Sequence, residues 1–189
     1  IQGAPTRRDA CVIVADFGHG FLDSQAVARL ATYSPWLAIT VQANSLNWGL
    51  NTLRKWDRAT MVVVDEPELR LATGEAKAPL LSLIEREAAR LRAEWFFVTR
   101  GHDGVTGWHK GEVVQAAAIA DNVVDRMGAG DAFLATAAPL AYAGAPLRTV
   151  LALASAAAAV QVGIVGNGPG VDRASVLALL ARREADLWR

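Results

Sequence analysis

The chain has 189 residues, of which 52% are hydrophobic and 20% are charged, so its composition suits one globular domain and excludes a disordered chain. Its 19 basic and 19 acidic residues balance, and we therefore expect neither a nucleic-acid nor a membrane partner. A single cysteine, Cys11, excludes an intrachain disulfide and favours a reducing, cytoplasmic location.

Apolar runs typical of strands alternate with segments of helical periodicity. Strands are expected at 10–15, 36–41, 60–64 and 95–99, and a hairpin at 104–109 and 112–116 that turns near Lys110 and Gly111. Helices are expected at 24–32, 77–92, 129–143, 147–160 and 173–185, the second with a solvated face of alternating charges at 85–92. This order predicts an α/β fold, a mostly parallel sheet covered by helices on both faces.

The stretch 149–171 contains no charged residue, which raises the alternative of a membrane span. It consists mostly of alanine and glycine and is interrupted by Ser155, Gln161, Asn167 and Pro169, so it is weakly apolar for that role. A buried helix followed by a loop is the better interpretation.

Polar or glycine-rich segments follow the expected strands, where parallel sheets bind their ligands. Because the carboxyl ends of parallel strands meet at one edge, these segments are expected to converge on one site. The segments are 16–20, 42–47, 65–68, 99–104 and the loop that contains Gly128.

The loop at Gly128 carries the most specific chemistry. Gly128, Ala129 and Gly130 precede an apolar helix, so small residues there expose unpaired backbone N–H groups to an anion. Asp131 follows at once and could accept a proton from an attacking hydroxyl group. That combination suits phosphoryl transfer to an alcohol, whereas the alternative is an ordinary loop in which Asp131 is only a helix-start acid.

Residues 125–133, with the sequence DRMGAGDAF, resemble the C-terminal signature D-T-x-G-A-G-D-x-F of the ribokinase-like (PfkB) carbohydrate kinases. The resemblance covers essentially the whole chain. It implies that Asp131 is the catalytic base, that the amides of residues 128–130 form an anion hole, and that ATP and Mg²⁺ are required. It also implies that Asp125 contributes to the nucleotide site, although Arg126 replaces the usual threonine.

Two further segments resemble elements of the same family. Asp65 to Glu68 resemble its N-x-x-E element, which implies that Asp65 and Glu68 order Mg²⁺ through water; a helix start with Pro67 as the first helical residue (N1) is the equal alternative. The segment 99–104 resembles a nucleotide loop, which implies that Thr99, Gly101 and Gly104 lie near the phosphates or ribose. Its alternative is an ordinary turn into the hairpin.

Near the C-terminus, Ser155 occupies the position at which the family has an asparagine beside the adenine, which implies looser base selection. Packing against a neighbouring helix is the alternative for this small residue. The segment 166–170 resembles the last nucleotide loop, so Gly168 is expected near the nucleotide, in a loop whose carbonyls bind a monovalent cation in some members.

The segment 16–20 is closest to the D-Y-x-K-G element of the heptose-kinase branch, with His19 in place of lysine. Gln42 and Asn44 stand where that branch has the acid and the lysine of D-P-K, so heptose-phosphate specificity is not supported. The nearest analogy is a sugar-kinase module that accompanies a nucleotidyltransferase domain. Family members have N-terminal strands and a lid, so we expect this chain to be the C-terminal part of a kinase domain, inactive alone, whose exposed sheet edge is covered by the missing portion or by a homodimer.

The leading hypothesis is thus ATP-dependent phosphorylation of a hydroxyl on a sugar or related small alcohol. The alternative is a non-catalytic nucleotide- or sugar-binding or assembly module that keeps the kinase fold, because Asp65, Arg126 and Ser155 depart from the family pattern.

Overall fold

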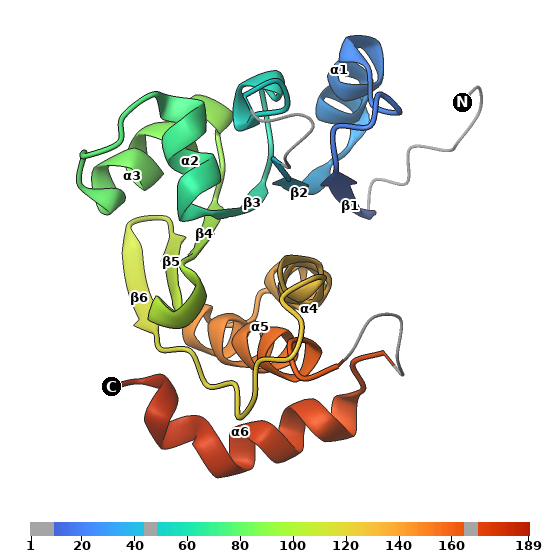
Figure 1. Cartoon of the computed structure of the whole chain (residues 1–189). Helices are drawn as coiled ribbons and strands as arrows, with labels where there is room; N and C mark the ends of the chain where they lie inside the picture. Colours follow the sequence, from blue (N-terminus) through green and yellow to red (C-terminus); the bar gives the residue numbers. More distant parts are fainter. Residues whose placement is uncertain (1–9, 44–48, 165–169) are drawn as a thin grey trace.

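The computed structural model describes residues 10–43, 49–164 and 170–189, which form a three-layer α/β arrangement around a six-stranded sheet (Figure 1). The strands lie in sequence order, and the first four are parallel while the last two are antiparallel. They are β1 (Cys11–Asp16), β2 (Trp36–Val41), β3 (Met61–Asp65), β4 (Trp95–Thr99), β5 (Val105–His109) and β6 (Glu112–Ala116). The predicted mostly parallel α/β fold is confirmed.

Helices from the two halves of the chain cover opposite faces of the sheet (Figure 1). One face carries α1 (Ser24–Tyr33), α2 (Glu66–Thr73) and α3 (Leu80–Leu91), which connect the parallel strands. The other face carries α4 (Ala129–Tyr142), α5 (Leu147–Gln161) and α6 (Arg173–Leu187). Two short 3₁₀ turns, η1 (Leu53–Lys55) and η2 (Gly101–Asp103), complete the elements.

The sheet separates two apolar cores, because successive side chains of a strand point to opposite faces. On β4, Phe96 packs among the helices α1–α3, whereas Phe97 packs on the side of α4 and α5. Phe97 lies edge-on against Phe133 of α4, with ring centroids 5.4 Å apart, so the signature helix is fixed to the centre of the sheet.

The structure departs from the expected helices at three points. The helix expected at 77–92 begins only at Leu80, because Pro79 is extended and caps it. Residues 66–73 form α2, which the sequence had suggested only as the alternative to a magnesium site. Glu87 was expected on a solvated face but is fully buried.

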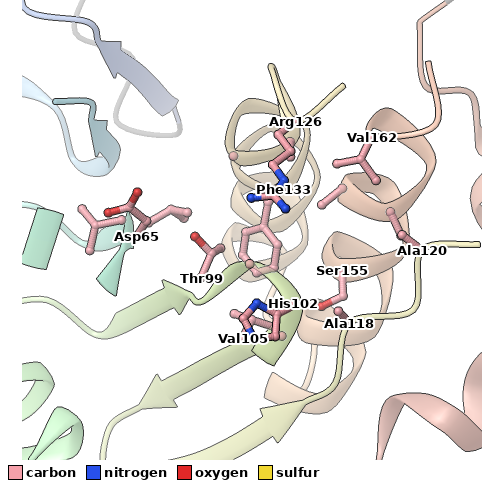
Figure 2. Close-up of a pocket in the computed structure, with 18 of the residues that line it drawn as sticks. Asp65, Thr99, His102, Val105, Ala118, Ala120, Arg126, Phe133, Ser155 and Val162 are labelled. Carbon is pink, nitrogen blue, oxygen red and sulfur yellow. The ribbon is translucent and has the colours of Figure 1, made fainter. Parts of the chain in front are cut away.

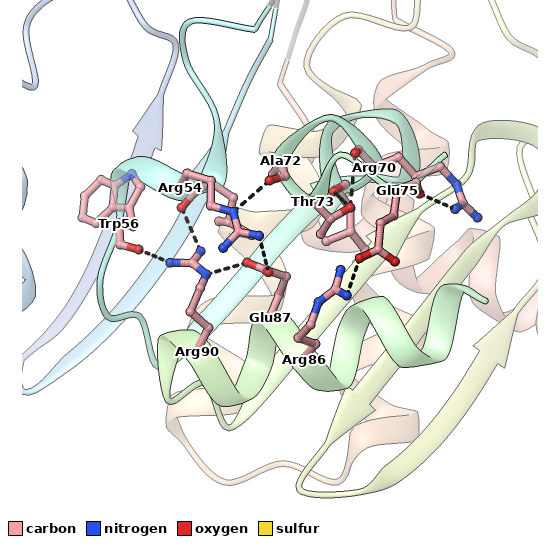
Figure 3. Close-up of polar contacts among 11 residues, drawn as sticks. Arg54, Trp56, Arg70, Ala72, Thr73, Glu75, Arg86, Glu87 and Arg90 are labelled. Atoms are coloured by element: carbon pink, nitrogen blue, oxygen red, sulfur yellow. Dashed lines mark hydrogen bonds and ion pairs between the residues drawn. The ribbon is translucent and has the colours of Figure 1, made fainter. Parts of the chain in front are cut away.

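Glu87 belongs to a buried ion cluster that holds the η1 segment against α3 (Figure 3). Its Oε2 accepts from Arg90 Nε at 2.7 Å, and its Oε1 lies 3.3 Å from a guanidinium nitrogen of Arg54. Arg90 also donates to the backbone oxygens of Trp56 and Leu53, so one guanidinium ties the chain between β2 and β3 to α3. Lys55 of the same segment then pairs with Asp16 at the end of β1.

β1 is the first strand of the described sheet and has one neighbour, β2. Large apolar side chains are exposed on or near this edge, among them Ile13, Phe21 and Leu50. That this edge is covered by an N-terminal portion or a second copy remains a prediction. No helix in the described residues has the length and apolar character needed to cross a bilayer.

Candidate active site

A pocket of about 550 Å³ lies beyond the carboxyl ends of β2, β3 and β4 and reaches across to α4 and α5 (Figure 2). Four of the five segments predicted to converge contribute to it, namely those after β2, β3 and β4 and the Gly128 loop. Its polar side contains Gln42, Asp65, Glu68 and Arg126, and its far side is lined mainly by alanine and valine. The pocket is therefore polar at one end and apolar at the other.

The fifth segment does not join this pocket. The carboxylate of Asp16 is buried, accepts hydrogen bonds from Trp56 Nε1 and the Gly18 amide, and pairs with Lys55 Nζ at 2.9 Å. Such a fully paired carboxylate holds the β1 loop to the η1 segment. The expected convergence is thus correct for four segments, and Asp16 has a structural role.

Asp65 and Glu68 lie on the pocket's acidic side, where they form a reciprocal cap at the start of α2. Asp65 Oδ1 accepts from the Glu68 amide at 2.6 Å, while Glu68 Oε2 accepts from the Asp65 amide at 2.9 Å. Glu68 Oε1 also accepts from the amide of Ala43, at 3.0 Å. The helix-start interpretation is therefore confirmed, and it uses the same two residues that the resemblance assigned to Mg²⁺.

Burial raises the pKa of Asp65 and raises that of Glu68 to about 7, in the latter case helped by the neighbouring Asp65 charge. Both oxygens of Glu68 already accept amides, and no cluster of three or more His, Cys, Asp or Glu side chains suited to a metal occurs in the described residues. The donor set fits Mg²⁺ held through water better than a direct cage of carboxylates.

The Gly128 turn begins α4 in the way that the sequence predicts. Gly128 adopts φ +79°, a left-handed conformation that favours glycine, and α4 has no side-chain cap at this end. Hydrogen bonds fix the segment before the turn. The amides of Val124 and Asp125 donate to Val162 O, and Asp125 Oδ1 accepts from the Met127 amide. The first amides of α4 consequently keep their hydrogen-bonding capacity for a ligand.

Asp131, in the first turn of α4, is half-buried and makes no ion pair within the described part of the chain. Its Oδ1 accepts from the side-chain amide of Gln42 at 3.4 Å. Burial raises the pKa of Asp131, and the Gln42 hydrogen bond opposes that rise. Ala129, Gly130 and Gln42 line the pocket, whereas Gly128 and Asp131 are not among its lining residues. Asp131 is connected to the pocket through its hydrogen bond with Gln42.

The apolar end of the pocket holds one polar side chain with no partner. Ser155 on α5 is 9% exposed, and its hydroxyl has no hydrogen-bond partner within the described structure. It lies near Ala118, Val105 and His102 in Figure 2. A buried hydroxyl without a partner is costly, so a ligand atom that bonds to it would be favoured there.

Most of the site residues expected from the sequence lie around this one pocket. Those lining it are Asp65, Glu68, Thr99, Gly101, Gly104, Ala129, Gly130 and Ser155. Asp125 instead shapes the Gly128 turn, and Gly168 lies outside the described residues. Gly104 has a structural reason to be glycine, because its φ is +85° and a Cβ atom would overlap Ala116 O.

Several lining residues were not assigned to the site from the sequence. Gln42 and His102 belong to segments that were expected to converge on the site, but neither was given a role of its own there, yet both line the pocket. The stretch 117–120 contributes a run of small apolar residues that has no motif of its own. The positions of residues 117–120 become clear only in the structure, where the chain after β6 lies beside α5 at the pocket.

Comparison with known proteins places this geometry in context. A family model described as pfkB family carbohydrate kinase matches residues 38–173. A bifunctional protein HldE from Methylobacillus flagellatus is 32% identical over 176 residues, which are 89% of this chain and 35% of that protein. A 2-dehydro-3-deoxygalactonokinase from Haloferax volcanii is 31% identical over 110 residues, covering 58% of this chain and 34% of that protein. The chain spans about a third of the length of these curated relatives.

Solved structures share the fold. A ribokinase from Arabidopsis thaliana, solved with ribose and ATP, superposes with a TM-score of 0.68 at 25% identity and covers 92% of this chain and 56% of its own. A Burkholderia thailandensis nucleoside kinase, solved with inosine, gives a TM-score of 0.70 at 22% identity over 89% of this chain and 56% of its own. The fold is therefore that of the ribokinase-like kinases.

Proposed function

The chain belongs to the pfkB family of carbohydrate kinases, and on that basis we propose that it transfers the terminal phosphate of ATP to a hydroxyl group of a sugar or related small alcohol. In this proposal Asp131 is the base, and the amides of Gly128, Ala129 and Gly130 receive the transferring phosphoryl group. The observation that carries the proposal is the position of Asp131 in the uncapped first turn of α4, hydrogen-bonded to Gln42, which lines the pocket with Ala129 and Gly130.

The chemistry follows from these groups. The alcohol oxygen attacks the terminal phosphorus as Asp131 takes its proton, and the bond from that phosphorus to the bridging oxygen breaks to leave ADP. Negative charge on the moving phosphoryl group is stabilised by the free amides at the start of α4 and by the positive end of that helix. Burial raises the pKa of Asp131, which makes it a better proton acceptor than an exposed aspartate, while the Gln42 bond keeps it ionised.

The two ends of the pocket fit the two ends of a nucleotide. The phosphates would lie at the Gly128 turn, with the Arg126 guanidinium on the lining beside them. The base would lie at the apolar end, where the Ser155 hydroxyl has no partner in the described structure. A hydroxyl both donates and accepts, so it could bond either an amino or an oxo group of a purine.

Mg²⁺, held through water near Asp65 and Glu68, would neutralise phosphate charge at the polar end. The chain's own contribution there is a preformed acidic side. Asp65 and Glu68 are fixed by their reciprocal backbone bonds and by the link to Ala43, so a water shell would meet oxygens that are already oriented.

The proposal names the acceptor only as a class, a sugar or related small alcohol. The related proteins include a ribokinase solved with ribose and ATP, a nucleoside kinase solved with inosine, and a 2-dehydro-3-deoxygalactonokinase. The end of β2 carries the neutral Gln42, and Lys55 is paired with Asp16, so neither supplies a free positive charge for an acceptor phosphate. These features favour an uncharged or weakly charged acceptor over a heptose phosphate.

A nucleotide-binding module without turnover is the second candidate. The observation that favours it is the reciprocal cap at the start of α2. Asp65 and Glu68 are needed there to satisfy helix-start amides, so their presence does not require a metal-dependent reaction. Under this candidate ATP would bind between Ser155 and the Gly128 turn, but no acceptor would be phosphorylated.

An Asp131→Asn variant separates the two candidates. We expect it to bind ATP as the parent does but to release ADP at least about 100-fold more slowly in the presence of an acceptor, because the base is lost. The assay would follow ADP release from the full-length protein, since this chain is expected to be inactive alone, with ribose, inosine, 2-dehydro-3-deoxygalactonate or a heptose phosphate. Asp57→Asn, which changes an exposed carboxylate away from the pocket, is the matched control. Equal turnover in Asp131→Asn and the parent would reject the base assignment.

A further inference from the structure

Gln42 is the first residue after β2, and its backbone is fixed by hydrogen bonds on both sides. Its amide donates to Asp16 O at 2.9 Å, and its carbonyl accepts from the side chain of Asn51 at 3.2 Å. The next amide, that of Ala43, donates to Glu68 Oε1 at 3.0 Å. Three parts of the chain, the end of β1, the first turn of α2 and the segment before η1, thus set the position of one residue.

The side chain of Gln42 extends from this fixed backbone toward α4, on the opposite face of the sheet from α1–α3. Its amide nitrogen lies 3.4 Å from Asp131 Oδ1, although the two residues are 89 positions apart in the chain. Gln42 is half-buried and lines the pocket. The contact is therefore made at the site itself and not on the outer surface.

We infer that Gln42 is a positioning residue for Asp131. The side-chain amide of Gln42 binds one carboxylate oxygen of Asp131 and leaves the other directed to the acceptor hydroxyl. This inference rests on the proposed function, since it assigns Asp131 as the base. A hydrogen bond from a neutral amide restrains the carboxylate rotamer without adding charge that would compete for the proton. An acidic residue at position 42 would instead place a second carboxylate against Asp131 and hinder its ionisation.

Neutrality and reach together explain why the amide suits this position. Lysine here would pair with Asp131 and hold its pKa low, which would weaken it as a base. Asparagine would be one methylene shorter and would lose contact across a gap that glutamine only just spans at 3.4 Å. Leucine would keep the volume of glutamine but would leave Oδ1 without its donor.

The direct test is the pKa of the Asp131 carboxyl group, measured by carbon-13 NMR of the labelled side chain in the full chain without nucleotide. Asp131→Asn assigns the signal by removing it. In Gln42→Leu we expect that pKa to rise by about 0.5 to 1 pH unit, because a donor of ordinary strength is lost. In Gln42→Glu, which keeps the length of the side chain, we expect a larger rise. Gln25→Leu, an exposed change on α1, should leave it unchanged.

The kinetic test uses the same variants with ATP and whichever acceptor from the panel above is turned over. We expect Gln42→Leu to lower kcat by about 10-fold with little change in the KM for ATP, and to move the acid limb of the pH profile upward. An Asp131 pKa that is the same in Gln42→Leu, Gln42→Glu and the parent would overturn the inference. The NMR result needs no turnover, so it stands apart from a failure of the proposed function, which Asp131→Asn reports.

Discussion

Neutralising Glu87 should destabilise the protein far more than neutralising an exposed glutamate that also pairs with α3. Glu87 is completely buried between Arg54 and Arg90, whereas Glu75 pairs with Arg86 at 2.5 Å and both side chains of that pair are nearly half exposed (Figure 3). In Glu87→Gln the Arg90 guanidinium, three-quarters buried, would lose its anion while still held against two backbone carbonyls. An uncompensated buried charge is the costly outcome of such a change.

The expected loss is about 3 kcal/mol of unfolding free energy, the low end for a broken buried pair, because Arg54 is half exposed and is partly screened by water. For a chain of this size that corresponds to a fall in Tm of about 6–12 °C. Glu75→Gln should cost less than about 1 kcal/mol, as exposed pairs do.

Urea unfolding followed by circular dichroism and tryptophan fluorescence would measure both variants, and coincident transitions would justify two-state values. Glu85→Gln, an exposed change on the same helix, controls for helix propensity and net charge. If Glu87→Gln and Glu75→Gln lost the same small amount, the ion cluster would not hold the η1 segment in the way described.

Two further outcomes follow from the pocket. The pKa of Glu68 is raised from 4.5 to about 7 by burial, so the folded state keeps this proton to a higher pH than the unfolded state does. The free energy of unfolding should therefore fall by up to about 3 kcal/mol as pH rises from about 4.5 to 7. Urea unfolding at several pH values should show a weaker pH dependence in Glu68→Gln than in the parent, and an identical dependence would contradict the assignment. In Gly104→Ala a Cβ atom would overlap Ala116 O, so calorimetry should show weaker ATP binding and a lower Tm than in Gly111→Ala, whose Cβ would meet nothing within 4 Å; equal effects would contradict the close approach at Gly104.

The strands and most helices could be predicted because their periodicity matches the burial that the fold imposes. β2 and β4 begin and end at the expected residues, and the hairpin turns at Lys110 and Gly111, both with positive φ. The Gly128 turn was also predictable, since its small residues and the acid after them fix a loop-to-helix junction by local chemistry alone.

Residues 65–68 show where local chemistry is ambiguous. An acid followed by proline and a second acid serves equally as a reciprocal helix cap and as a metal-ordering element, and the structure shows the cap in use. Glu87 shows a second limit, because Glu85 and Arg86 before it are charged and exposed while Glu87 is buried in a cluster with Arg90 and with Arg54, 33 positions earlier.

The convergence of segment 42–47 and the Gly128 loop was predicted, but the particular contact between the side chains of Gln42 and Asp131 was not. It depends on the end of β2 and the start of α4 meeting at one edge of the sheet, and no spacing in the sequence encodes a distance between residues so far apart. The sequence also does not predict that the Ser155 hydroxyl is buried without a hydrogen-bond partner in the described residues. Only this missing partner distinguishes it from a small residue that packs against a neighbouring helix.

The two helix layers are encoded one after the other in the sequence, which determines the order in which the parts of the pocket are synthesised. The layer formed by α1, α2 and α3 is encoded entirely before residue 92, and the layer formed by α4, α5 and α6 entirely after residue 128, with the hairpin between them (Figure 1). The first stretch supplies Gln42, Asp65 and Glu68, and the second supplies the first amides of α4 and Asp131. A ribosome therefore finishes the residues of one layer before it begins the other, and the pocket can be complete only after the late helices have been synthesised.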